Sequence, residues 1–306
     1  MEVAAQGPRM APLRQWTSEA GAAWNRFWFA PADPTPLAAV RIGLAALLAW
    51  STLTAWPQLE DWLRPDSPEV AALVPASMWS LHRGSAPWAW HVLQGVQLAA
   101  IVGLGLGWRT RLACPVAFVL HVSFINAAHD AAFGYDAVAS LLLLYLSLAP
   151  CGAAWSLDAR RRGEGKPRPS VGANLGLRLI QLHACAIYLA AGLAKLEGAT
   201  WWSGMAAYQS MLAPERWLAP FSFEFAFHYP WTATVLSNLL TYLTLAYEIG
   251  FPFLVWKPLL RGPLLVTGAA MHLGTVVFMG MDQFGLAMLL LLLAFVPADW
   301  LRRSSR

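Results

Sequence analysis

Charge is scarce in this sequence: only 12% of its 306 residues are Asp, Glu, Lys or Arg, about half of the roughly 25% that is typical of a soluble domain. Hydrophobic residues make up 58% of the chain. They fall in blocks of about 20, the length that a helix needs to cross a bilayer. This composition excludes a soluble globular enzyme and an intrinsically disordered chain.

The sequence motifs of several site classes are also absent. The three cysteines, Cys114, Cys151 and Cys185, lie far apart with no CxxC pair, which excludes a disulfide-bonded secreted scaffold and argues against a zinc site. We expect them to pack as small apolar residues inside helices. There is no phosphate-binding loop, nucleophile elbow or dinucleotide fingerprint, and no HxxxH or ExxH pair supports a metal site. The first 30 residues lack the apolar core and cleavage site of a signal peptide.

Apolar runs bounded by charge, proline or glycine predict eight membrane helices. The runs cover residues 36–55, 88–106, 110–129, 136–154, 174–196, 231–256, 262–281 and 282–298. The division between the last two, at Met281-Asp282-Gln283, is the least marked. We therefore expect an all-α, polytopic integral membrane bundle of about eight transmembrane helices.

The positions of the basic residues predict the orientation of this bundle. With the N-terminus in the cytoplasm, all but four of the 21 Lys and Arg residues fall on the inner side, as the positive-inside bias of short loops requires. The four on the outer side are Arg64, Arg83, Lys195 and Arg216. Both termini are then cytoplasmic, and the net charge of +4 reflects orientation rather than binding to nucleic acid.

Three regions follow from this pattern. Residues 1–30 form a cytoplasmic segment in which Trp24, Phe27 and Trp28 are interleaved with Arg26, as in a helix that lies in the plane of the inner headgroups. Residues 31–300 form the transmembrane domain, and residues 301–306 form a basic cytoplasmic tail.

Lys195 is an ionisable residue at the outer end of the fifth predicted helix, and such residues in spans mark functional sites by default. Its ammonium could snorkel to the interface. Alternatively, Gln181, Tyr188 and Lys195 recur every seventh residue and share one helix face, which would then look into the bundle. Burial disfavours the charged form of a lysine, so an inward-facing Lys195 could act as a general base.

Other polar residues at membrane depth leave two interpretations open. His121, His183 and His272 lie near mid-span on three helices, as packing residues or as ligands. Glu248 lies in the inner half of the sixth predicted helix and needs a partner, so we expect it to pair with Arg41 or Arg178.

The outer connection 197–230 is rich in aromatic residues, among them Trp201 and Trp202. Aromatic residues at this depth form either a belt at the lipid–water boundary or a cap over an outward-facing pocket. Both interpretations stay open.

Three segments carry recognisable motifs in a fixed order. Asp33-Pro34 with Leu37-Ala38 and Arg41 matches D-P-x-x-L-A-x-x-R, and residues 155–158 match W-S-[LV]-D. The run Tyr188–Leu196 matches the pattern Y-x-x-A-G-x-x-K-L and is followed by Trp202 and Gly204. Together these segments resemble vitamin K-dependent γ-glutamyl carboxylase and the wider HTTM (horizontally transferred transmembrane) family built on that enzyme's membrane part. The similarity covers about residues 27–290.

The resemblance implies a chemistry. In the carboxylase, the lysine of the first pattern deprotonates reduced vitamin K; the oxygenated quinone species then abstracts a glutamate γ-proton, and CO₂ is added. Lys195 inherits the role of base, with Tyr188 and His272 beside it as catalytic groups. Gln181, His183 and Trp202 would bind a cofactor, for which a reduced isoprenoid quinone is the implied candidate, and no metal is implied.

Two departures bear on the reaction. The carboxylase has an Asn-His pair about 20 residues before its W-S-[LV]-D motif, where this chain has Gly134-Tyr135-Asp136. The carboxylase's large lumenal portion, which holds the protein substrate, has no counterpart in these 306 residues. Full glutamate carboxylation is therefore less favoured than related chemistry.

We expect a carboxylase-like protein of the bacterial inner membrane that acts at the outer face on a quinone, another lipid or a secreted peptide. Short family members include the membrane component that helps mature the sporulation-delaying peptide toxin, which implies a peptide partner. The alternative is a non-catalytic lipid- or peptide-binding accessory of maturation or export, in which Lys195 pairs with an anionic ligand.

Overall fold

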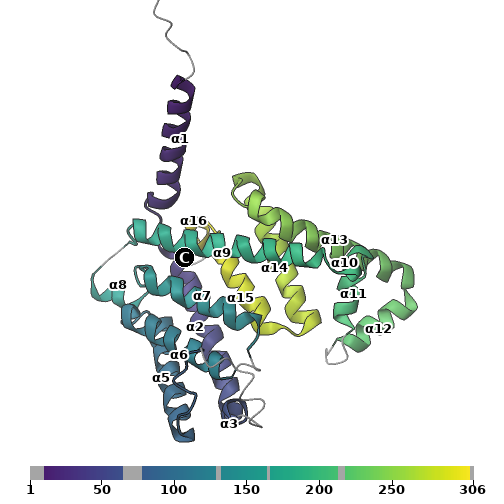
Figure 1. Ribbon diagram of the computed structural model, residues 1–306, viewed down its shortest axis with the longest axis horizontal. Helices are drawn as coiled ribbons and strands as arrows, with labels where there is room; N and C mark the ends of the chain where they lie inside the picture. The colour runs from purple at the N-terminus through teal and green to yellow at the C-terminus, as the bar shows by residue number, and fades with distance from the viewer. Residues whose placement is uncertain (1–9, 65–77, 129–131, 164–165, 213–217, 304–306) are drawn as a thin grey trace, which may run out of the picture.

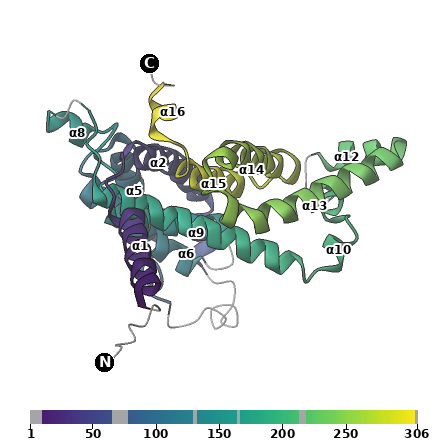
Figure 2. The same ribbon diagram turned by 90° about the horizontal axis from the view of Figure 1, so that it is seen from above.

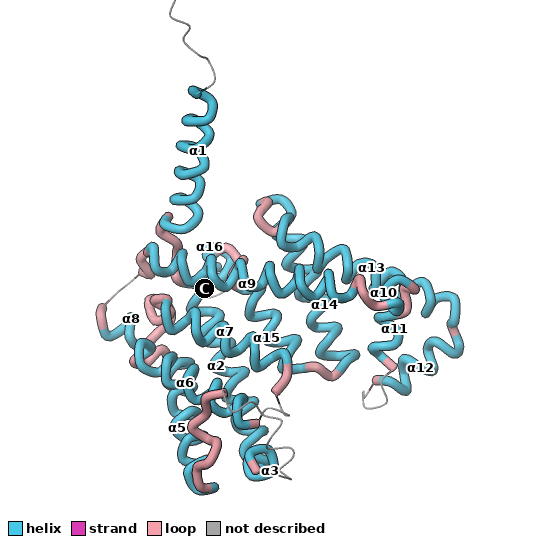
Figure 3. The backbone as a smooth tube through the Cα atoms, viewed as in Figure 1, coloured by secondary structure: helices cyan, strands magenta, loops and turns pink. Residues whose placement is uncertain are grey.

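The computed structural model describes residues 10–64, 78–128, 132–163, 166–212 and 218–303. Within these ranges the chain is helical, with one isolated antiparallel bridge between Ala32 and Ser170 and no strand. Figure 3 shows helices joined by short loops throughout this part of the chain. The predicted all-α class is confirmed.

Each of the eight predicted apolar runs forms a helix. The helices are α2 (Thr35–Ala55), α5 (Pro87–Leu106), α6 (Thr110–Ala127), α7 (Gly134–Leu148), α9 (Val171–Lys195), α13 (Pro230–Leu254), α14 (Pro258–Met279) and α15 (Asp282–Leu293). The largest error is at α7, which ends six residues before the predicted boundary at 154. Pro150 is the cause, because the residue before a proline favours extended backbone and Ala149 adopts it. Gly280, in the left-handed conformation, ends α14 and separates it from α15.

Five of the described helices are long and apolar enough to cross a membrane: α2 with its extension to Leu63, α5, α6, α9 and α14. Two shorter apolar helices, α7 and α15, accompany them. The chain is therefore an integral membrane protein, while the total of eight spans and the cytoplasmic location of the termini stay predictions. Arg216 and His129 lie outside the described residues.

Two groups of helices are joined by α9 and α15, which each contact both groups (Figures 1 and 2). In the first group α2 lies at the centre and packs against α5, α7 and α15, and α6 packs between α5 and α7. In the second group α9 packs along α13, and α14 packs along α15. The core is continuous across both groups and includes Leu44 and Leu48 of α2, Leu142 of α7 and Phe251 of α13. The three cysteines are buried and free, although Cys151 lies in the turn after α7 rather than in a helix.

Arg41 of α2 holds the predicted inner end of the first group together. Its side chain is fully buried. Nη1 donates to the carbonyl of Leu104 at 2.6 Å, and Nη2 donates to the carbonyl of Trp155 at 2.7 Å. The last carbonyls of a helix have no partner within that helix, so Arg41 completes the end of α5. Gly107 makes this possible, because a Cβ there would lie 2.5 Å from Nη1 of Arg41.

Asp158, the last residue of the W-S-L-D segment, caps the start of α6. Its carboxylate accepts hydrogen bonds of 2.9 Å from the backbone amides of Arg109 and Thr110 and from the Thr110 hydroxyl. Desolvation raises the pKa of Asp158, but these hydrogen bonds outweigh it and hold the pKa below its usual value. The motif residues Arg41 and Asp158 are thus structural, since they complete the end of α5 and the start of α6.

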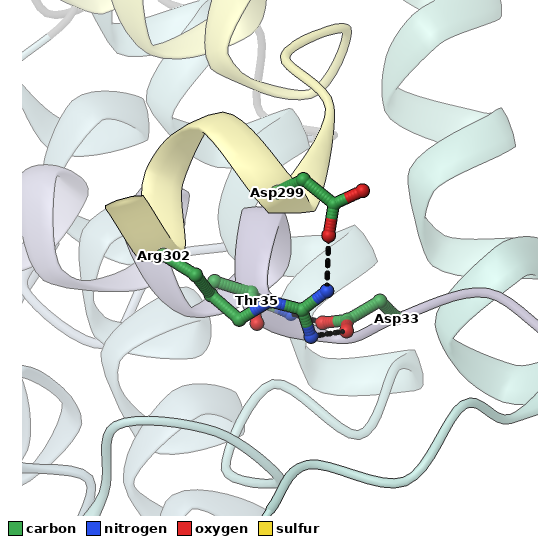
Figure 4. A network of polar contacts seen from close by, with 4 residues as sticks. All are labelled: Asp33, Thr35, Asp299 and Arg302. Carbon is green, nitrogen blue, oxygen red and sulfur yellow. Dashed lines mark hydrogen bonds and ion pairs between the residues drawn. The ribbon is translucent and has the colours of Figure 1, made fainter. Parts of the chain in front are cut away.

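The C-terminal end of the described chain contacts the segment before α2 at Asp33. Asp33 accepts a hydrogen bond from the amide of Thr35 at 2.8 Å and forms an ion pair with Arg302 of α16 (Ala298–Arg303), which also bonds Asp299 (Figure 4). Residues 304–306 of the predicted basic tail lie outside the described part.

The predicted N-terminal helix is present as α1 (Met10–Phe29), which extends away from the other helices (Figure 1). Its C-terminal end contacts the bundle, where the carbonyl of Phe27 accepts hydrogen bonds from Asn174 at 2.7 Å and Arg178 at 3.2 Å. Its placement in the headgroup plane stays a prediction, and residues 1–9 lie outside the described residues.

The loop before α5 is fastened to the end of α6 through His82. His82 is 1% exposed, and its Nδ1 shares a hydrogen bond of 2.8 Å with the Ser123 hydroxyl. Its carbonyl accepts a hydrogen bond of 2.9 Å from the indole of Trp90. Burial lowers the pKa of His82 from 6.5 to about 4, so the folded protein holds this imidazole neutral.

The substitution Arg41→Lys should lower the free energy of unfolding by about 3 kcal/mol, because one ammonium cannot serve two carbonyls in the fork geometry and leaves a buried acceptor unpaired. Thermal unfolding of the detergent-solubilised protein measures this. Arg160→Lys, at an exposed position, is the control and should unfold like the wild type. Equal stability of both variants would show that the Arg41 fork is dispensable.

His82 should make stability fall as the pH drops. Between pH 6.5 and about 4 the unfolded chain binds a proton at His82 that the folded chain excludes, so stability is retained above this window and lost on entering it. At pH 5 the loss is about 2 kcal/mol. Melting curves at pH 7.5 and pH 5 should show a smaller difference for His82→Gln than for the wild type; an unchanged difference contradicts the assignment.

Candidate functional site

Gln181, Tyr188 and Lys195, which are spaced seven residues apart on α9, each contact a different neighbouring helix. Lys195 contacts Glu248 of α13, Tyr188 contacts His272 of α14, and Gln181 contacts the carbonyl of Ala294 at the end of α15. Because residues seven apart lie on one face of a helix, a single face of α9 contacts three neighbours in succession.

Lys195 forms an ion pair with Glu248. Its Nζ lies 2.9 Å from Oε1 and 2.8 Å from Oε2 of Glu248. The two side chains are 24% and 9% exposed, and the ring centroid of Trp201 lies 5.2 Å from Nζ. The ammonium is thus directed toward a carboxylate and an aromatic ring, which is not the geometry of a snorkelling lysine.

The prediction that Glu248 pairs with Arg41 or Arg178 is wrong. The Arg41 guanidinium is occupied by the carbonyls of Leu104 and Trp155. Arg178 lies over the ring of Phe27 at 4.3 Å and donates to Gln181 at 3.0 Å. The depth of the two helices explains the error. Glu248 lies 18 residues into the 25-residue helix α13, about 27 Å from its start at 1.5 Å per residue, so the C-terminal end of α9 meets the last third of α13 rather than its N-terminal tip.

The chain after α9 folds back along the free part of α13. The short helices α10 (Ala199–Trp202), α11 (Ala206–Met211) and α12 (Ala219–His228) follow Lys195, and α11 and α12 both pack against α13. The carbonyl of Gly204 accepts hydrogen bonds from Ser237 and Thr241 of α13, at 2.8 and 3.0 Å. The aromatic connection thus covers the part of α13 that extends beyond the ion pair.

Gly192, the glycine of the A-G-x-x-K-L segment, sets the distance between α9 and α13. A Cβ at this position would lie 2.8 Å from Cγ1 of Ile249, 3.2 Å from Cβ of Glu248 and 3.3 Å from the amide nitrogen of Ile249. Contacts this short would force α13 away from α9. The missing side chain therefore allows the two helices to approach until Lys195 reaches Glu248.

A second polar pair lies beside the first. The Tyr188 hydroxyl is 2.7 Å from Nε2 of His272, and these residues are 1% and 4% exposed. The ring of Tyr247, which precedes Glu248, lies edge-on to Tyr188 at 5.4 Å. Among the described residues, Nδ1 of His272 and the hydroxyl of Tyr247 are buried without a hydrogen-bond partner. Unpaired buried polar atoms are costly.

The remaining predicted site residues lie elsewhere. His183 shares a hydrogen bond of 2.9 Å with the Tyr145 hydroxyl on α7, and Trp202 is 63% exposed and donates to the carbonyl of Leu196. Gln181 lines a separate cavity of about 270 Å³ together with Arg178 and Trp256. Lys195, Tyr188 and His272 are thus gathered through α13, whereas the three predicted cofactor-binding residues are not.

The three mid-span histidines do not converge. His121 lies 3.4 Å from the carbonyl of Asp136, His183 contacts Tyr145, and His272 contacts Tyr188. In the described part of the chain, no group of three His, Cys, Asp or Glu side chains is arranged to hold a metal ion.

Two functional candidates, Tyr247 and the partnership of Glu248 with Lys195, escaped the sequence analysis. The signal was present: a carboxylate and an amine stand in two different predicted spans, and each needs a counter-charge. Helix lengths alone predict different depths for the two residues, because they do not show that α13 extends beyond the end of α9.

Lys195→Met should lower the free energy of unfolding by about 3–5 kcal/mol, because it leaves Glu248 buried without a counter-charge. The double variant Lys195→Met/Glu248→Gln should regain at least half of that loss. Thermal unfolding in detergent compares the two, with the exposed Lys257→Met as a control that unfolds like the wild type. A double variant as unstable as the single one would argue against a coupled buried pair.

Comparison with known proteins places these observations in a family. The family model of the HTTM domain matches residues 29–300. Searches of curated proteins and of solved structures each gave no significant match. The match covers nearly the whole chain. It includes the polar cluster between α9, α13 and α14, which consists of Lys195, Glu248, Tyr188, His272 and Tyr247. The chain therefore belongs to the HTTM family, a carboxylase-related family of membrane proteins.

Proposed function

We propose that this protein carries out carboxylase-like, proton-abstracting chemistry within the membrane, with Lys195 as the base and Glu248 as its proton partner. The buried ion pair beside the Tyr188–His272 pair is the observation that supports the proposal. The reactant is a membrane-soluble molecule with an acidic hydroxyl, or a peptide that reaches the same site. We place the site on the outer side of a bacterial inner membrane, following the predicted orientation.

The Lys195–Glu248 ion pair supports a role for Lys195 as a base rather than as a binding site for an anion. An ammonium that is already neutralised by Glu248 attracts an anionic ligand only weakly, because the pair has no net charge. Transfer of one proton from Nζ to the carboxylate leaves both groups uncharged, which burial favours. The resulting amine has a free lone pair and can accept a proton from a reactant hydroxyl.

The residues around the pair fit a quinone-like reactant. The unpaired Tyr247 hydroxyl and the unpaired Nδ1 of His272 can each bond a ring oxygen, and Phe251, which lies 4.7 Å from Tyr188 between ring centroids, supplies an aromatic surface. A bound reduced isoprenoid quinone would supply an acidic hydroxyl and reducing electrons. The protein's part is to orient that hydroxyl through Tyr247 and His272, and to accept its proton at Nζ of Lys195.

The first experiment identifies the reactant: mass spectrometry of small molecules that co-purify with the gently extracted protein, expected to show an isoprenoid quinone. The protein in nanodiscs is then supplied with the reduced form of that molecule and O₂, and its consumption is followed by absorbance. Lys195→Arg should reduce the rate about 10²- to 10⁴-fold, the usual contribution of a general base, because a guanidinium is not deprotonated in proteins. Lys257→Arg should retain the wild-type rate.

The non-catalytic alternative predicts a different pattern. If Lys195 only binds an anionic lipid or peptide, Lys195→Arg keeps the charge and should behave like the wild type, while Lys195→Met should lose the co-purified ligand. Wild-type activity in Lys195→Arg would therefore remove the base and leave a binding accessory.

A further inference from the structure

A large cavity lies at the opposite end of α9 from Lys195. It has a volume of about 1270 Å³ and is formed by the start of α6, the end of α7, α8 (Leu157–Arg161) with its flanks, and the start of α9. Ser170 and Gly172 line it at the α9 side. Since the 25 residues of α9 span about 37 Å, this cavity is separate from the polar cluster around Lys195.

The cavity is strongly basic. Four arginines line it, Arg109, Arg111, Arg162 and Arg168, against a single carboxylate, Asp158. Asp158 is already engaged by the amides of Arg109 and Thr110. Within the described ranges, no ion pair is made by Arg111 or Arg168. The lining therefore carries an excess of positive charge directed at the same space.

The same cavity has an apolar wall. Leu112 in the first turn of α6 and Leu148 at the end of α7 line it and are 62% and 71% exposed. Each of these leucines lies at the end of an apolar helix. Leu148 continues into Ala149 and Pro150, which also line the space. Arginines and exposed apolar side chains thus line the same cavity, as the boundary between headgroups and acyl chains requires.

We propose that this cavity binds the phosphate diester of an anionic phospholipid, with the arginines around the phosphate and the acyl chains along Leu112 and Leu148. Basic pockets between helices on the cytoplasmic side are suited to anionic lipid headgroups. A free phosphate shares the charge chemistry but gains nothing from the leucines. The volume also exceeds what a phosphate needs, and it is above the roughly 300–1,000 Å³ of ordinary small-molecule sites.

The general attraction of basic loops to an anionic membrane does not account for this arrangement. Arg160 and Arg161 of α8 are exposed like the cavity arginines, yet they do not line the cavity. They belong to the same end of the molecule and provide a matched comparison. If the lipid binds in the cavity, its affinity depends on which arginines are removed. If it is attracted only by surface charge, its affinity depends on how many are removed.

The test measures the melting temperature of the full chain in detergent during titration with phosphatidylglycerol. Phosphatidylcholine of the same acyl chains, inorganic phosphate and water-soluble glycerophosphoglycerol are titrated in parallel. Phosphatidylglycerol should raise the melting temperature in a saturable way, and the other three should give little or no shift. Arg111→Gln/Arg168→Gln should weaken the apparent affinity about 30-fold, since each basic residue contributes about fivefold. The charge-matched Arg160→Gln/Arg161→Gln should keep the wild-type affinity.

Each other outcome overturns the proposal. Equal weakening in both double variants would show that the lipid responds to total surface charge rather than to the cavity. A shift with inorganic phosphate or glycerophosphoglycerol as large as that with phosphatidylglycerol would assign a phosphate site without a lipid. An equal shift with phosphatidylcholine would show that the arginines do not select the ligand. Both double variants replace exposed side chains, so their melting temperatures without lipid should match the wild type and exclude misfolding as the cause.

Discussion

A lysine and a glutamate within a bilayer are stable only when they meet, and the contact between Lys195 and Glu248 determines how α9 and α13 are aligned. Burial of either charge alone costs several kcal/mol, so the alignment of the two helices is constrained by electrostatics as well as by packing. The Tyr188–His272 pair and the unpaired Tyr247 hydroxyl lie where this alignment puts them. The proposed chemistry therefore depends on a contact that also holds the second group of helices together.

The other end of the bundle is organised by hydrogen bonds to backbone groups. Arg41 completes the last turn of α5, and Asp158 completes the first turn of α6. Two of the segments that carry the resemblance, residues 33–41 and 155–158, meet through the hydrogen bond from Arg41 to the carbonyl of Trp155. At this end, the residues that carry the resemblance stabilise helix ends. The residues that carry it around Lys195 belong to the candidate site.

Much of the helical layout was predictable from the sequence, and the reason is physical. Bilayer thickness fixes the length of an apolar run, and glycine and proline mark the breaks, as at Gly280 after α14 and Pro150 after α7. The partner of Glu248 was not predictable in this way, because α13 extends far beyond the end of α9. His183 is predicted to bind a cofactor, yet its side of α9 contacts Tyr145 of α7. Counting residues predicts how deep a residue lies within a span. The rotation of a helix and its height relative to its neighbours are set by packing.

Gly192 fixes the separation of the Lys195 amine and the Glu248 carboxylate although it carries no ionisable group itself. The position acts as a spacer, since a Cβ there would lie 2.8 Å from Cγ1 of Ile249 and 3.2 Å from Cβ of Glu248. An alanine or serine at this position would therefore move α13 outward and lengthen the ion pair. The strength of a contact between two charged groups inside the bundle is thus set by the size of a small, uncharged neighbour.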